Sequence, residues 1–403
     1  MDAPSELTQR LFAPGFMADP FATFARLNEQ TPLCRVAMPD GQVVRLVTRY
    51  DDVQTVLKDR RFSVDPQHMD RSGLDHTPPN VDREGTLMSM DGPKHARLRA
   101  LAAQAFTPRF VENLRPRIQQ LTDELVDGFA GRGRVEFVEA FALPLPITVL
   151  MEVLGVPEAD HAVFHAGVMA AMAFRDPGSS TVTPETVAQF EAFNAKSWEL
   201  ILQKRADPQD DLVSRMALAR EGGEQFTDNE LGQLVGLIIM AGYDTTVNLL
   251  SLGTLALLSN PDQLAWLRAN PAQLPQTVEE LLRHTAIATT SVARYATEDV
   301  ELGGQPVRKG EGLMVIFTAA NHDGARFPEP ERLDLARADN QHVAFGYGPH
   351  YCLGAPLARL EAQIAFETLL RRLPGLRLSA APAAVVWRDA WVMRGLRRLE
   401  LEF

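Results

Sequence analysis

The sequence predicts a mainly α-helical chain with small β-sheets, an α+β fold in a single domain over residues 1–403. Three observations predict it. Apolar residues recur with helical spacing along most of the chain. The runs with strand character are short and clustered. No internal repeat, low-complexity stretch or linker divides the chain into halves.

The expected helices are marked by their first residues. Thr183 precedes Pro184, which places a capping residue ahead of a proline at the first helical position. Thr227 and Glu230 form a capping box that opens a long apolar helix. The predicted helices span 51–58, 94–105, 108–129, 146–154, 184–205, 228–259, 261–269, 274–284 and 353–372.

The expected strands are short. Segments 33–38 and 42–48 flank a Pro-Asp-Gly turn and therefore predict a hairpin. The polar, turn-rich segment 66–85 predicts a long loop, and loops of this length in a compact domain are usually functional. Further strands are predicted at 292–296, 307–309, 313–317 and in the tail, 391–403.

Composition and charge narrow the class of protein. Hydrophobic residues make up 45% and charged residues 23% of the chain, as in ordinary soluble proteins, which argues against disorder. The 40 Lys and Arg against 52 Asp and Glu give a net charge of −12, which disfavours binding to nucleic acid. Cys34 and Cys352 make no disulfide framework, and residues 1–16 lack the apolar core of a signal peptide. We therefore expect a reducing, cytoplasmic location.

The apolar stretch 231–258 is long enough to cross a membrane. Asp244 lies at its centre, where a charge is costly in lipid, and Thr245 and Asn248 lie beside it. We therefore expect a helix through the middle of a soluble domain, and no membrane partner.

The most informative residues are FGYGPHYCLG at 345–354. Gly346 and Gly348 permit positive φ and a close approach of the backbone to a flat partner. Cys352 stands directly before a patterned helix, whose positive dipole end favours the thiolate. No second cysteine lies nearby, which counts against structural zinc and iron–sulfur clusters. A lone thiolate suits a haem iron, while a buried cysteine without chemistry is the ordinary alternative.

This loop resembles the haem-ligand loop of the cytochrome P-450 family, whose pattern is F-G-x-G-x-H-x-C-x-G. Further motifs follow in family order, and the resemblance covers nearly the whole chain. It implies the cytochrome P-450 fold, with haem b between the long central helix and the cysteine-loop helix. Cys352 is then the axial ligand of the iron. Every fixed position matches, at Phe345, Gly346, Gly348, His350, Cys352 and Gly354.

Glu280 and Arg283 share a face of a predicted helix. By itself this spacing predicts only an exposed pair worth a few tenths of a kcal/mol, roughly 0.2–0.5. The pair resembles the ExxR motif of the family, and FPEPERL at 327–333 resembles the segment that supplies a third member, here Arg332. The resemblance implies a buried Glu280–Arg283–Arg332 network that holds the region of the haem loop in place.

The two haem carboxylates need cations or hydrogen-bond donors. His95 and Arg99 lie at i, i+4 on one helix face, which alone more often indicates a solvated face. Their context, GPKHARLRALAAQAFTP, is similar to a family helix that meets a haem propionate. The resemblance adds Arg294 and His350 as the other propionate contacts, and Phe345, Gly346 and Gly354 as loop residues at the cofactor.

AGYDTT at 241–246 lies halfway along the long helix. A spot of close packing would explain Gly242, which costs about 1 kcal/mol inside a helix. Asp244 and Thr245 are poor structural choices there, because both burden the helical backbone in an apolar run. The motif resembles the dioxygen groove of the family. Thr245 is then expected to bind the oxygen and Asp244 to supply protons, as catalytic residues.

Pocket residues follow from the resemblance by position, and plain core packing is the alternative for each of them. Most are apolar, and methionines adapt to irregular shapes. No Arg or Lys is among them, which favours a neutral, hydrophobic small molecule such as a polyketide, terpenoid or steroid. They are Met88, Leu237, Met240, Ala241, Thr289, Thr290, Val292, Val392 and Met393.

The resemblance implies a monooxygenase that inserts one oxygen atom from O2 into such a molecule, by hydroxylation or epoxidation. No flavin, nicotinamide or iron–sulfur module is recognisable, so electrons from NAD(P)H are expected indirectly, from a separate ferredoxin and ferredoxin reductase. We expect a monomer. A peroxide-driven peroxygenase, which would lack the Asp–Thr pair, and a non-catalytic haem carrier stay open as alternatives.

Overall fold

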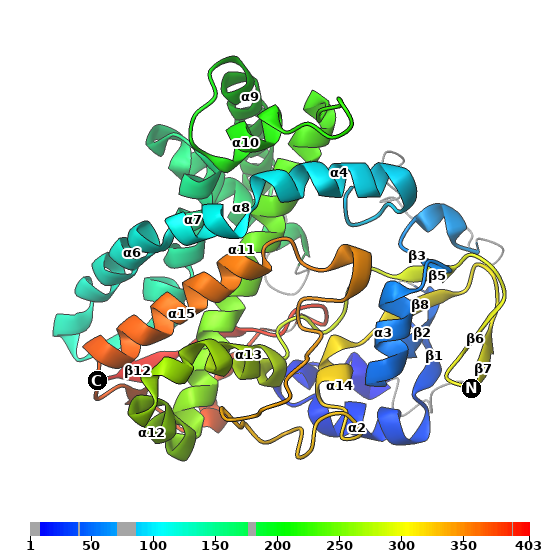
Figure 1. Cartoon of the computed structure of the whole chain (residues 1–403). Helices are drawn as coiled ribbons and strands as arrows, with labels where there is room; N and C mark the ends of the chain where they lie inside the picture. Colours follow the sequence, from blue (N-terminus) through cyan, green and yellow to red (C-terminus); the bar gives the residue numbers. More distant parts are fainter. Residues whose placement is uncertain (1–8, 39–40, 71–85, 176–182, 389) are drawn as a thin grey trace. The chain divides into compact units, whose positions relative to one another are not determined.

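The computed structural model describes residues 9–38, 41–70, 86–175, 183–388 and 390–403 (Figure 1). The predicted helical fold with small sheets is confirmed. The chain divides into two compact units, each assembled from separated stretches, so they are not successive domains. The single domain 1–403 stays a prediction. Unit 1 comprises Met1–Lys94, Gln276–Cys352 and Ala390–Gly395, and unit 2 comprises His95–Pro275, Leu353–Asp389 and Leu396–Phe403.

Unit 1 contains a five-stranded sheet and a small hairpin. Their strands are β1 Leu33–Ala37, β2 Val43–Val47, β3 Phe62–Ser63, β5 Arg294–Ala296, β6 Val300–Leu302, β7 Gln305–Val307 and β8 Gly312–Val315. The strand order of the sheet is β1-β2-β8-β5-β3, and β6 pairs with β7. The predicted hairpin forms one edge of the sheet, because β1 pairs antiparallel with β2. The pair β2–β8 is parallel.

The helices of unit 1 cover an apolar core. They are α2 Phe21–Gln30, α3 Tyr50–Lys58, α14 Phe317–Asn321 and α13 Leu274–Thr285, the last from Gln276 onward. Phe24 and Leu27 of α2 share a buried apolar cluster with Cys34 and Leu46 of the sheet. Burial raises the pKa of the Cys34 thiol to about 11. Cys34 is therefore a core residue that stays protonated at neutral pH.

Unit 2 is the more helical unit. Its helices are α4 Gly92–Ala105 from His95 onward, α5 Pro108–Asn113, α6 Arg115–Asp127, α7 Pro144–Leu154, α8 His161–Arg175, α9 Pro184–Ala206, α10 Leu212–Leu218, α11 Asp228–Ser259, α12 Pro261–Ala269 and α15 Ala355–Arg372. α11 contacts α7, α9 and α15, and α15 crosses it in Figure 1. Two small sheets complete the unit, with strand orders β4-β12-β9 and β10-β11. Their strands are β4 Arg134–Glu136, β9 Arg377–Leu378, β10 Val386–Trp387, β11 Leu396–Arg398 and β12 Glu400–Glu402.

The long helix α11 begins at the predicted capping box. The Glu230 amide donates to Thr227 Oγ1 over 3.2 Å, and the Thr227 amide donates to the Glu230 carboxylate over 3.0 Å. α11 is long and apolar enough to cross a membrane, yet 61% of its most apolar window is buried inside the protein. This burial agrees with the prediction of a core helix.

Most predicted helices end within a few residues of the observed bounds, and α11 and α12 match them. The helix predicted over 108–129 is broken at Leu114 into α5 and α6. Pro116 explains the break, because its ring excludes the carbonyl of residue 112 and it has no amide hydrogen to donate. Helices α2, α10 and α14 were missed. α10 and α14 have only 7 and 5 residues, whereas α2, with 10 residues, is longer than the predicted α3 and its length does not explain the miss. Of the predicted loop 66–85, residues 71–85 lie outside the described part of the chain.

The helices α8 and α9 pack closely at Gly167. A Cβ atom at this position would lie 2.1 Å from the Cβ of Phe193, which is a buried residue of α9. Gly236, inside α11, offers a contrast, because a Cβ there would meet no atom within 4 Å. Alanine substitutions at these two glycines therefore distinguish the cost of overpacking from the gain in helix propensity.

We expect Gly167→Ala to lower the free energy of unfolding by about 1–3 kcal/mol, because overpacking forces α8 away from α9. The control Gly236→Ala raises it by up to about 1 kcal/mol, because alanine is the better helix former. Urea unfolding followed by circular dichroism measures both. Equal effects of the two substitutions would contradict the packing at Gly167.

Candidate haem-thiolate site

Residues 345–352 of the cysteine loop form a compact turn in unit 1. The Cys352 amide donates to the Phe345 carbonyl over 2.9 Å, and the Gly346 amide donates to the Val343 carbonyl over 2.9 Å. Gly348 has φ +75°, and a Cβ there would lie 2.7 Å from the Leu57 carbonyl oxygen at the end of α3. Only glycine tolerates this conformation together with this approach. The loop is thus closed by its own hydrogen bonds and seated on α3.

Cys352 is partly exposed, forms no disulfide, and precedes Gly354, the N-cap of α15, by two residues. Within the described residues no group of three or more His, Cys, Asp or Glu side chains is arranged to hold a metal ion. Cys352 therefore offers a single protein ligand, which fits an iron whose other ligands come from a macrocycle.

Arg294 opens β5 and is 4% exposed. Its Nε has no hydrogen-bond partner among the described residues. Burial lowers the pKa of Arg294, and the nearby charge of Asp91 partly offsets this. A buried guanidinium with an unused N–H group suits an anionic ligand such as a haem propionate. The residues present therefore fit the cofactor that the sequence predicts.

His350 is joined to Asp91, with Nε2 2.9 Å from Oδ1. Burial alone would raise the pKa of Asp91, but hydrogen bonds from His350, Ser63 and the Val64 amide hold it below its usual range. The carboxylate of Asp91 thus fixes the orientation of the His350 ring. Its contact with a propionate stays a prediction, as do those of His95, which is buried on α4 in unit 2, and of Arg99 one turn later.

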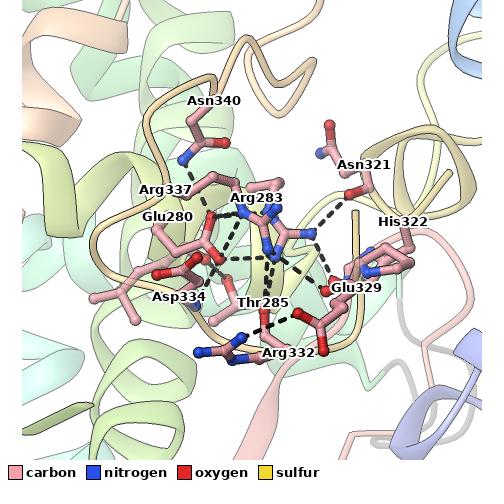
Figure 2. A network of polar contacts seen from close by, with 12 residues as sticks. Glu280, Arg283, Thr285, Asn321, His322, Glu329, Arg332, Asp334, Arg337 and Asn340 are labelled. Carbon is pink, nitrogen blue, oxygen red and sulfur yellow. Dashed lines mark hydrogen bonds and ion pairs between the residues drawn. The ribbon is translucent and has the colours of Figure 1, made fainter. Parts of the chain in front are cut away.

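Glu280 and Arg283 form a fully buried ion pair on α13 (Figure 2). Arg283 Nε and Nη2 each donate to one carboxylate oxygen of Glu280 over 2.8 Å. Arg283 Nη1 also donates to the carbonyls of Asn321 and Pro330. Because the charged side chains are paired with each other, the network escapes the large cost of an isolated buried charge. Burial first, and the Arg283 charge second, lower the pKa of the adjacent His284 to about 3, so it adds no positive charge.

The predicted third member, Arg332, is wrong. Its side chain is 57% exposed and pairs with Glu329, and only its carbonyl oxygen accepts from Arg283. The second cation on Glu280 is Arg337, whose Nε lies 3.2 Å and 3.3 Å from the two carboxylate oxygens (Figure 2).

The sequence carried no clear signal for Arg337. Leu333, Leu335 and Arg337 are all buried, whereas Arg332 and Ala336 are exposed. The Arg337 amide donates to the Asp334 carbonyl over 3.0 Å, so this segment contains a turn, and alternation along a strand does not decide which arginine points inward.

Asp244 and Thr245 lie in the unbroken middle of α11 in unit 2. Thr245 Oγ1 donates to the Ala241 carbonyl over 2.8 Å. Leu237, Ala241 and Thr245 follow each other at i, i+4 and are partly or fully exposed, whereas Asp244 is 7% exposed. A Cβ on Gly242 would meet Leu150 at an ordinary 3.5 Å, so close packing does not require this glycine.

Arg388 is the polar residue of this region that the sequence did not reveal. It follows β10, and its Nη1 lies 2.5 Å from Asp244 Oδ1. The side chains are 17% and 10% exposed, so the pair is largely withdrawn from water. Arg388 stands in VVWRDA, which carries no motif, and 144 residues separate it from its partner. Nothing in the sequence pointed to it.

The predicted pocket residues fall in both units. In unit 1 the Thr289 amide donates to the Val392 carbonyl over 2.9 Å, and Met393 bridges Ala288, so these segments lie side by side. Thr290 Oγ1 donates to the Val315 carbonyl, so the hydrogen of this hydroxyl is already used in a contact within unit 1. In unit 2, Met240 lies beside the part-exposed face of α11. Met88 and Val292 are exposed. Their roles in a pocket stay predictions.

Comparisons with known proteins show the family to which the chain is similar. The family model described as cytochrome P-450 matches residues 186–374. The chain is 40% identical to cytochrome P-450 monooxygenase PikC of Streptomyces venezuelae, covering 100% of this chain and 95% of that one. It is 40% identical to the mycinamicin IV hydroxylase/epoxidase of Micromonospora griseorubida over 92% of both. The solved structure of the cytochrome P-450 PksS of the Bacillus subtilis bacillaene polyketide synthase matches with a TM-score of 0.89, at 35% identity, over 97% and 98% of the two chains.

Fold, cysteine loop and relatives together define an oxidoreductase of the haem monooxygenase class. The chain belongs to the cytochrome P-450 family, of the bacterial type. The predicted resemblance is therefore confirmed, and the family uses haem and O2.

We expect Arg337→Met to lower the free energy of unfolding by about 3–5 kcal/mol, because it removes one partner of a buried charge network. Arg332→Met, at an exposed position, changes it by no more than about 0.5 kcal/mol. Urea unfolding and the fraction of protein that retains haem are the measurements. A larger loss from Arg332→Met than from Arg337→Met would reverse the assignment.

Proposed function

We propose that the protein hydroxylates or epoxidises a neutral, hydrophobic natural product, of the polyketide, terpenoid or steroid class. The observation that carries the proposal is Thr245 on a part-exposed, otherwise apolar face of the long helix α11, with the buried carboxylate of Asp244 next to it in the chain. A polyketide is favoured among these classes, because PksS is named for a polyketide synthase and a second relative for its action on mycinamicin IV.

The haem is held, in this proposal, by the thiolate of Cys352 and by cations at its carboxylates. When bound, it supplies O2 activation and the transfer of one oxygen atom. The hydrogen bond from the Cys352 amide to Phe345 fixes the backbone that carries the sulfur. The buried Arg294 balances a propionate charge, and His350, His95 and Arg99 provide the remaining donors.

Asp244 and Thr245 manage protons in this proposal. The Thr245 hydroxyl hydrogen points to the Ala241 carbonyl, which leaves the oxygen lone pairs of Oγ1 to accept a hydrogen bond. Asp244 is nearly buried, and its carboxylate can take a proton from water and pass it toward Thr245 Oγ1. A peroxide-driven peroxygenase, the alternative reaction, needs no such supply, so the pair favours O2 as oxidant.

The electrons come from NAD(P)H through a ferredoxin and its reductase in this proposal, and the enzyme works as a cytoplasmic monomer. The docking surface is a basic patch comprising Arg99, Arg109, Arg115 and Arg359. Its members lie on α4, α5, α6 and α15 of unit 2, and α15 packs against both α5 and α6. Arg115 is already paired with Glu112 over 2.5 Å, whereas Arg109 is exposed. Arg109 is therefore the sharper test of the patch.

We expect Thr245→Ala to lower the product formed per NADH at least fivefold and to divert oxygen to H2O2, because no hydroxyl group then positions the proton that Asp244 supplies. Candidate ligands are first screened for the low- to high-spin shift, and products are measured by mass spectrometry. Thr246→Ala, one residue on and back-bonded to Gly242, is the matched control and keeps the wild-type ratio. Turnover by H2O2 alone, as fast as with redox partners, would favour the peroxygenase.

We expect charge reversal, Arg109→Glu with Arg359→Glu, to slow reduction by ferredoxin at least tenfold at low salt and to flatten its salt dependence, because steering by opposite charges is screened by ions. Stopped-flow reduction measures it. Arg134→Glu, at an exposed position of β4, serves as the control and leaves the rate unchanged. If the double variant kept the wild-type rate and salt slope, ferredoxin would dock elsewhere.

A further inference from the structure

We propose that Arg388 is a positioning residue for proton delivery, which holds the Asp244 carboxylate in one orientation. The inference rests on the proposed role of Asp244. Both residues belong to unit 2, so the contact lies within one compact unit.

The backbone presents Arg388 at a defined place. Strand β10 pairs antiparallel with β11, and its register shifts between Val386 and Trp387. Such an irregularity bends a strand and re-aims the side chains beside it. Arg388 is the next residue, and its Nη1 meets Asp244 Oδ1 over 2.5 Å. The contact therefore joins the end of a small ribbon to the middle of α11.

The surroundings make this ion pair stronger than a surface pair. The Asp244 side chain is 10% exposed and lies in an apolar helix, where an unpaired carboxylate is costly. Its neighbour Tyr243 is also buried. Burial first, and the Asp244 charge second, raise the pKa of Tyr243, so the phenol stays neutral. Its hydroxyl lies 3.5 Å from Met169 Sδ. Arg388 is thus the cation that balances Asp244.

The pair determines which oxygen of Asp244 exchanges protons. Oδ1 is engaged by the guanidinium, so proton exchange falls to Oδ2. The guanidinium also restricts rotation of the carboxylate, since a charge-assisted hydrogen bond is short and directional. Without Arg388 the carboxylate is free to turn, and Oδ2 no longer faces one direction.

The pair also removes Arg388 as an anchor for an anionic substrate. Its charge is already matched by Asp244 within the same unit. This agrees with the neutral substrate in the proposed function. That prediction was made from other residues and did not depend on Arg388.

The test uses the holoenzyme with a surrogate ferredoxin and ferredoxin reductase at saturating concentration. The variants are Arg388→Met, Arg388→Lys, Asp244→Asn and the double variant Arg388→Met with Asp244→Asn. O2 consumption and H2O2 release are measured in H2O and D2O. The ferrous–CO spectrum and the thermal midpoint report whether each variant folds and holds haem. Arg398→Met, in the paired strand β11 with an exposed side chain, is the matched control.

We expect Arg388→Met to at least double the solvent isotope effect on O2 consumption, as Asp244→Asn does, and the double variant to go no further. Arg388→Lys restores at least half of the wild-type behaviour, and Arg398→Met leaves it unchanged. A wild-type isotope effect in Arg388→Met beside an altered one in Asp244→Asn would overturn the role of Arg388 alone. A wild-type effect in Asp244→Asn would instead overturn the role of Asp244, and the role of Arg388 with it.

Discussion

The buried carboxylate of Glu280 is the interaction on which unit 1 depends. It accepts from Arg283, Arg337, Asn340 and the Asp334 amide, so one side chain ties α13 to the segment that leads toward the cysteine loop. That segment has few regular elements, and its order comes from side chains rather than from a backbone ladder. A buried charge is stable only when all its partners are present. The position of the loop that carries Cys352 therefore depends on the hydrogen-bond network around Glu280, whose residues have no role in the proposed reaction.

The helix α11 imposes the corresponding constraint on unit 2. Its C-terminal half is buried on all sides, which leaves little freedom there. The middle combines a buried face with the part-exposed face that holds Thr245. The same helix thus packs in the core of unit 2 and presents the side chain of Thr245, which has a catalytic role in the proposed function. The cost of placing Asp244 in it is offset by Arg388, a residue from the far end of the chain.

The sequence predicted what depends on local patterns. The capping residues and the apolar period gave the ends of α11, and the ten-residue loop gave Cys352 and its glycines. What it missed depends on contacts between distant segments. Arg337 was passed over because Arg332 stands inside the recognisable motif, and because a turn at 334–337 brings Arg337 to Glu280. Arg388 had no signal at all, because its partner is defined only by the fold. The break at Leu114 was readable from Pro116.

The turn from Asp334 to Arg337 has a consequence for how the family can vary in length. The Arg337 amide donates to the Asp334 carbonyl over 3.0 Å, and the Asp334 amide donates to the Glu280 carboxylate over 3.0 Å. An inserted or deleted residue between them opens this turn and moves the Arg337 guanidinium away from Glu280. Length variation in this segment is therefore expected to be rare, whereas exposed loops accept any number.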